Sequence, residues 1–168
     1  VEVVVSLGNR YKTNVVSTDQ KRIYLTFDDG PHGENTEAVL DLLSAKKVPA
    51  AFFCIGSKAE TQPDVVRRMV RDGHLVGNHS YSHSAKFPVF DVDRMVADIA
   101  KCNEVLEEIT EEKVLFFRPP FGVTNPLLKK ALKMSPSVAE IAVTLVKTLQ
   151  DLHARLSQQH VHVAVAML

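Results

Sequence analysis

Tryptophan is absent from this sequence, and cysteine occurs only twice, at Cys54 and Cys102. Two cysteines are too few to build a disulfide framework. Cys54 lies in an apolar run and Cys102 on the apolar stripe of a helical pattern, so we expect two buried free thiols and not a disulfide. This cysteine usage excludes a small disulfide-stapled fold.

Long apolar runs and an excess of charge of one sign are also missing. No run approaches the roughly 20 residues of a transmembrane helix. We find no signal peptide and no initiator Met, and interpret the chain as a mature or excised fragment. Lys plus Arg number 20, as do Asp plus Glu, with no basic run. We therefore expect no transmembrane segment and no nucleic-acid partner.

What the sequence does contain is an alternation of strand-like and helix-like segments without repeats or linkers. Its 168 residues predict a single domain over residues 1–168, large enough to bury roughly 70% of its unfolded surface. Period-two or continuously apolar runs predict strands at residues 23–27, 50–55, 75–76 and 114–117. Apolar stripes with capping signals predict helices starting near Asn35 or Thr36, between Pro63 and Gly73, after Asp91, and at Asn125-Pro126. This order predicts an α/β fold with a parallel sheet, open or closed into a barrel.

Three polar stretches directly follow predicted strands. They are residues 26–31 (Thr-Phe-Asp-Asp-Gly-Pro), 79–83 (His-Ser-Tyr-Ser-His) and 118–122 (Arg-Pro-Pro-Phe-Gly). Because the carboxyl ends of parallel strands meet at one edge of the sheet, we expect the three stretches to converge there.

Each stretch offers chemistry, and each also has a plain structural interpretation. His79 and His83 are four residues apart, so on a helical turn both would face one metal ion; alternatively they are surface or core histidines. The side chains of Asp28 and Asp29 diverge along an extended backbone, so that one can reach a metal and the other the substrate; the alternative is an ordinary Asp-Gly turn. Arg118, on a backbone stiffened by two prolines, can grip a carboxylate bidentately, or make a surface salt bridge.

Together and in this order, the three stretches resemble the first three motifs of the polysaccharide deacetylase family. This family has the NodB-type domain and is also called carbohydrate esterase family four. The resemblance extends over about residues 22–132. It implies a distorted, incomplete (β/α) barrel of parallel strands. It also implies a hydrolase that removes acetyl groups from N- or O-acetylated carbohydrate of the chitooligosaccharide, peptidoglycan or xylan class.

The resemblance also implies a role for each matching residue. Asp28 would be the general base, steadied by Arg118, and the amide of Phe121 would stabilise the oxyanion. One divalent metal ion, zinc first and cobalt, nickel or manganese as alternatives, would be bound by Asp29, His79 and His83. The partner would be an acetylated oligo- or polysaccharide, and the location extracellular, periplasmic or in the cell envelope. No sequence feature assigns an oligomeric state.

After residue 132 the sequence departs from the family pattern. The motif expected to carry a tryptophan is missing, and residues 138–156 instead predict a helix. Residues 163–168 resemble the family's last strand, but the chain stops at Leu168, where that strand would deliver its histidine. The general acid is therefore unassigned, with His160, His162 or a histidine beyond Leu168 as candidates, and we expect weak catalysis. The alternatives are an inactive sugar- or metal-binding domain, or a metal-dependent hydrolase of small amides.

Overall fold

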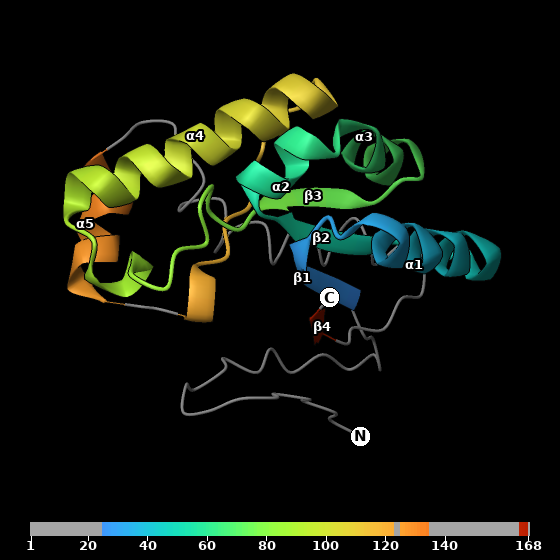
Figure 1. The fold of residues 1–168 in the computed structure, drawn as a ribbon, viewed down its shortest axis with the longest axis horizontal. Helices are drawn as coiled ribbons and strands as arrows, with labels where there is room; N and C mark the ends of the chain where they lie inside the picture. The colour runs from blue at the N-terminus through green and yellow to red at the C-terminus, as the bar shows by residue number, and fades with distance from the viewer. Residues whose placement is uncertain (1–24, 123–124, 135–164, 168) are drawn as a thin grey trace, which may run out of the picture.

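The computed structural model describes residues 25–122, 125–134 and 165–167 of the chain. Strands and helices alternate over most of this length (Figure 1). The elements are β1 (Leu25–Gly30), α1 (Gly33–Lys46), β2 (Ala50–Cys54), α2 (Gly56–Thr61), α3 (Pro63–Arg71), β3 (Leu75–Asn78), the 3-10 turn η1 (Phe87–Val89), α4 (Val92–Thr110), the 3-10 turn η2 (Pro120–Gly122), α5 (Pro126–Met134) and β4 (Val165–Met167).

The strands form one parallel sheet in the order β3-β2-β1-β4, which confirms the predicted α/β architecture. The segment predicted as a strand at 114–117 continues the sheet beyond β3, but only as a single parallel bridge between Asn78 and Phe117. The amide of Asn78 donates to the carbonyl of Phe116 (2.8 Å), and the amide of Arg118 donates to the carbonyl of Asn78 (2.9 Å). The described strands thus form an arc of the expected incomplete barrel.

Helices α2, α3 and α4 lie together along one side of the sheet, and α5 packs against α4 (Figure 1). All five residues of the central strand β2 are buried, as its continuous apolar run predicts. Helix α4 buries the predicted stripe that includes Met95, Ile99 and Leu106. Cys54 and Cys102 are both buried free thiols, which confirms that prediction. The core therefore lies between the sheet and the helices, with the strand ends left at its rim.

Most helix boundaries follow the capping signals. The carboxylate of Asp91 accepts from the amide of Arg94 (2.8 Å) and caps α4 as predicted. Helix α1, however, begins at Gly33, before the predicted start at Asn35 or Thr36. The helix begins earlier because a residue remote in sequence satisfies its first amide: the side-chain oxygen of Gln62 accepts from the amide of Gly33 (2.7 Å). Helix α2 was not predicted, because six residues are too short for a periodic stripe.

The C-terminal predictions are only partly described. The strand predicted at 163–168 is present as β4, which runs parallel to β1 with Asp28 opposite Met167. The helix predicted at 138–156 and both candidate acids, His160 and His162, lie outside the described residues. Among the helices that the structure describes, none has the length and apolar content needed to cross a bilayer.

Candidate metal centre and carboxylate pair

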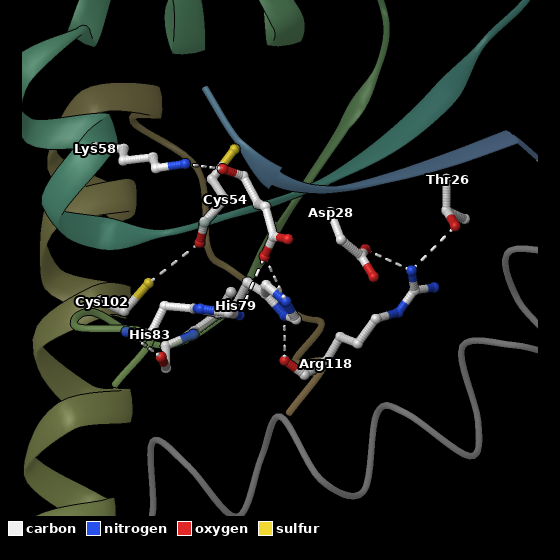
Figure 2. A network of polar contacts seen from close by, with 11 residues as sticks. Thr26, Asp28, Cys54, Lys58, His79, His83, Cys102 and Arg118 are labelled. Atoms are coloured by element: carbon white, nitrogen blue, oxygen red, sulfur yellow. Dashed lines mark hydrogen bonds and ion pairs between the residues drawn. The ribbon is translucent and has the colours of Figure 1, made fainter. Parts of the chain in front are cut away.

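The three polar stretches meet at the carboxyl edge of the sheet, as the parallel order predicts. Backbone hydrogen bonds continue past the strand ends and join neighbouring loops. The amide of Ile55 donates to the carbonyl of Gly30 (2.8 Å), and the amide of His79 donates to the carbonyl of Cys54 (2.9 Å). The site residues therefore stand on extensions of the sheet (Figure 2).

Asp28 and Asp29 point in different directions because the strand bulges between them. The pairing of β1 with β2 shifts register between Asp28 and Gly30. Asp29 takes a left-handed conformation with a φ of 68°. Sequence reasoning expected divergence along an extended backbone, and that account is wrong. A bulge leaves one residue unpaired and re-aims its side chain, so here it directs the two carboxylates to different partners.

The carboxylate of Asp29 faces the two histidines. Its Oδ1 lies 3.2 Å from Nε2 of His79 and 3.1 Å from Nε2 of His83. One ligand atom from each of the three residues lies within 4.8 Å of the others. The structure thus brings together the three residues predicted to hold a metal ion.

The two histidines do not share a helical turn, contrary to the sequence-based expectation. They lie on a loop after β3, in which Ser80 (φ 67°) and His83 (φ 45°) both have left-handed conformations. The hydroxyl of Ser80 accepts from the amide of His83 (3.0 Å). From α4, the carboxylate of Asp98 accepts from the amides of Tyr81 and Ser82, each at 3.2 Å. These hydrogen bonds hold the loop so that both imidazoles approach Asp29, as they would have done from the predicted helical turn.

Asn78, which sequence reasoning did not select, anchors this loop from inside. It is fully buried, and its side-chain oxygen accepts from the amide of Ser80 (2.7 Å). Its amide group donates to the carbonyl of Ile99 (2.8 Å) and to the side-chain oxygen of Asn103 (2.6 Å), both on α4. A polar residue at the end of an apolar strand, directly before His79, was the signal available in the sequence.

The protonation of His79 suits a metal ligand. Its Nδ1 lies 2.7 Å from the carbonyl oxygen of Arg118. Because a carbonyl can only accept, we assign the proton to Nδ1, which leaves the Nε2 lone pair facing Asp29. Burial lowers the pKa of His79 from its ordinary value of 6.5, so the ring is neutral at pH 7.

The arrangement around Asp29 fits a bound cation. In the described part of the chain, its buried Oδ1 has no hydrogen-bond donor although two imidazole nitrogens are close to it. A buried oxygen acceptor facing an imidazole lone pair is unfavourable unless something positive lies between them. Two imidazoles and one carboxylate are a donor set typical of zinc and related divalent ions, with positions left open for other ligands. The residues present therefore fit a divalent metal.

Asp28 is held by Arg118, as the sequence-based assignment requires. Nη1 of Arg118 lies 2.5 Å from Oδ1 of Asp28 and donates a further bond to the hydroxyl of Thr26 (3.0 Å). The guanidinium stacks over the ring of Phe53 at 4.0 Å. The Asp28 side chain is only 14% exposed and that of Arg118 30%, so the pair is not a surface salt bridge. Asp28 is thereby oriented beside the three predicted metal ligands Asp29, His79 and His83 (the metal-ligand cluster) without joining them.

Phe121 lies in η2, beside His83. Its ring is 55% exposed and packs on the ring of His83 with 4.8 Å between centroids. Its backbone is left-handed, with a φ of 57°. The residue is thus next to the metal-ligand cluster, and the role of its amide in holding an oxyanion stays a prediction.

Comparison with known proteins identifies the family of the chain. Residues 15–136 match the family described as polysaccharide deacetylase. The chain belongs to the polysaccharide deacetylase family. It is 35% identical over 130 residues to the peptidoglycan-N-acetylmuramic acid deacetylase PdaC of Bacillus subtilis, a match that covers 77% of this chain and 28% of PdaC. It is 40% identical over 89 residues to a chitooligosaccharide deacetylase of Rhizobium leguminosarum bv. trifolii, covering 53% of this chain and 41% of that enzyme.

Solved structures share the fold. The structure of PdaC superimposes with a TM-score of 0.66 at 26% identity, covering 90% of each chain. A family 4 acetyl xylan esterase from Clostridium thermocellum, solved with a cobalt ion, superimposes with a TM-score of 0.64 at 25% identity, covering 86% of this chain and 88% of that one. The chain spans less than half the length of the two curated relatives named above.

Proposed function

We propose that this chain is a metal-dependent hydrolase that removes acetyl groups from N- or O-acetylated carbohydrate. The observation that carries the proposal is that the adjacent carboxylates of Asp28 and Asp29 contact different partners. Asp29 faces two histidine nitrogens at 3.1–3.2 Å, whereas Asp28 is held apart by Arg118 at 2.5 Å. Such a pair suits a metal-dependent hydrolase, in which one carboxylate can bind the metal while the other accepts a proton from water.

Asp29, His79 and His83 would hold the metal. A divalent ion there, most simply zinc, supplies Lewis-acid polarisation to the acetyl carbonyl and to water. The cobalt ion in the C. thermocellum structure makes cobalt a suitable substitute for measurement. The hydrogen bond from His79 Nδ1 to the carbonyl of Arg118 fixes the ring's orientation toward that position.

Asp28 would act as the general base. Arg118 holds it in one orientation, so that it can take a proton from the attacking water. The amide of Phe121 would donate to the carbonyl oxygen as that oxygen gains negative charge, an interaction commonly worth about 3–4 kcal/mol. A protonated group must then reach the leaving nitrogen or oxygen, and His160 and His162 remain the candidates within the sequence.

The relatives suggest the substrate class and the location. Deacetylases named for peptidoglycan and for chitooligosaccharide are among them, so we propose an acetylated oligo- or polysaccharide rich in N-acetylated amino sugars. We further propose that the protein acts in the cell envelope or outside the cell, where such polymers occur. Fractionation of cells expressing the full-length protein tests the location.

Acetate release tests the function. Zinc- or cobalt-loaded protein is assayed on peptidoglycan, chitin and xylan fragments and on an aryl acetate, with chelated protein as control. We expect release only with metal, Asp28→Asn to keep metal and lose turnover, and Asp29→Ala to lose both. Metal binding without release from any substrate would favour an inactive binding domain. Cleavage of small amides but not of acetylated sugars would favour an amidohydrolase.

A further inference from the structure

Lys58 contacts the metal-ligand cluster through the backbone. Its Nζ donates to the carbonyl oxygen of Asp29 at 2.7 Å, from the first turns of α2 (Figure 2). The Lys58 side chain is half-buried and comes from an element 29 residues away in sequence. Nothing in the sequence-based assignment, in which α2 was not predicted, gives this lysine a role.

The carbonyl that Lys58 holds belongs to a residue with a left-handed backbone. Asp29 has a φ of 68°, a left-handed conformation that is uncommon for residues other than glycine, although aspartate adopts it more readily than most. The bulge at Asp29 is what separates its carboxylate from that of Asp28. A bond that fixes the Asp29 carbonyl therefore also fixes the direction in which its carboxylate points.

The same short helix also holds the histidine loop. The amide of Gly56 donates to the carbonyl of Ser80, and the amide of Ser57 donates to the carbonyl of Tyr81, each at 3.0 Å. Both acceptors lie between His79 and His83. The first turn of α2 thus binds the loop that carries two of the predicted ligands, and Lys58 binds the residue that carries the third.

We propose that Lys58 is a positioning residue of the metal centre, which keeps the Asp29 bulge in the conformation that directs its carboxylate to the histidines. The inference rests on the proposed metal-dependent function. A positioning role for Lys58 and a purely electrostatic role predict opposite changes in metal affinity when the lysine is removed. Removing a cation near a dication site relieves repulsion and should tighten metal binding, whereas losing a positioning contact should weaken it.

The test measures metal affinity by competition with a chromophoric chelator, for zinc and for cobalt. Outer-shell contacts of metal ligands typically affect affinity by 10–100-fold, and we expect about a tenfold loss in Lys58→Met. The visible absorption spectrum of the cobalt form should change as well, because the Asp29 ligand shifts. Lys129→Met, at an exposed lysine of α5, is the matched control and should leave affinity and spectrum unchanged.

Lys58→Arg serves as the rescue variant, because it keeps a charged donor on a flexible stem. We expect it to bind metal within about threefold of the wild type, well inside the range of outer-shell effects. Thermal unfolding of the metal-free proteins checks that each variant is folded. Unchanged or tighter binding in Lys58→Met, or no recovery in Lys58→Arg, overturns the proposal. Failure of the wild type to bind metal would instead refute the proposed metal centre.

Discussion

Replacing Arg118 with methionine should impair the proposed base, Asp28, without impairing the proposed metal centre. The side chain of Arg118 holds Asp28 at 2.5 Å, whereas its backbone carbonyl accepts from His79. Only the side-chain contact is lost in Arg118→Met, because the peptide carbonyl remains. The methionine can still pack on the ring of Phe53, where the guanidinium now lies at 4.0 Å. We therefore expect turnover to fall while metal affinity holds.

The size of the loss follows from the ion pair. Unit charges about 4 Å apart interact by roughly 4 kcal/mol at an effective dielectric constant of 20. The Asp28 and Arg118 side chains are 14% and 30% exposed, so solvent screening reduces this to about 2–3 kcal/mol. If the misorientation of Asp28 in Arg118→Met costs the transition state a comparable amount, about 2–3 kcal/mol, kcat/KM falls by about 30–150-fold, at tenfold for each 1.36 kcal/mol.

The assay is acetate release per bound metal, with the metal dissociation constant measured on the same samples. Arg67→Met is the matched control, because within the described part of the chain Arg67 pairs with Asp64 at an exposed position, and its loss should change neither quantity. Arg118→Lys, which keeps the charge but not the planar fork, should fall between the wild type and Arg118→Met. A large loss of metal affinity at an unchanged rate per bound metal would show that Arg118 serves the metal ligands and not the base.

Two further substitutions test the structure around the site. In Gly56→Ala the new methyl group would lie 2.8 Å from the ring of Tyr81 and 3.1 Å from the Cα of Cys102, so we expect a loss of about 1–3 kcal/mol in the free energy of unfolding; an unfolding midpoint equal to wild type would contradict this. His74 is buried, its Nδ1 accepts from the amide of Ala50 (3.2 Å), and burial lowers its pKa below 6.5. The unfolded chain therefore takes up a proton that the folded chain resists, so stability should fall as the pH drops below about 6.5. Denaturant unfolding with chelator present should show a smaller acid loss in His74→Asn, which keeps an acceptor but does not titrate, and equal losses would refute the assignment.

Local sequence patterns were sufficient to predict a parallel α/β sheet, but not its strand order, and to select the polar residues that meet at its carboxyl edge. The spacing of apolar residues predicted the continuous burial of β2 and the buried stripe of α4. The polar stretches were expected to converge because each directly follows a predicted strand. The shapes of the loops were not predictable in this way. The left-handed residue Asp29 is contacted by Lys58, and the loop that leads to His83 is contacted by Asp98. Both partners lie far away in the sequence. The spacing of apolar residues carries no information about such contacts. The sequence therefore predicted which residues converge at the sheet edge, but not the loop geometry that brings them together.

The backbone bonds that continue past the strand ends have a consequence for ion exchange at the proposed metal centre. Since the amides of Ile55, His79 and Arg118 each pair with the neighbouring strand's end, the ligand-bearing segments are ordered by the same cooperative ladder as the sheet. The entropy of gathering three ligands is then a cost of folding, not of binding. A preorganised site of this kind should capture an ion without a slow rearrangement, and its amides should exchange with solvent deuterium at similar rates with and without metal.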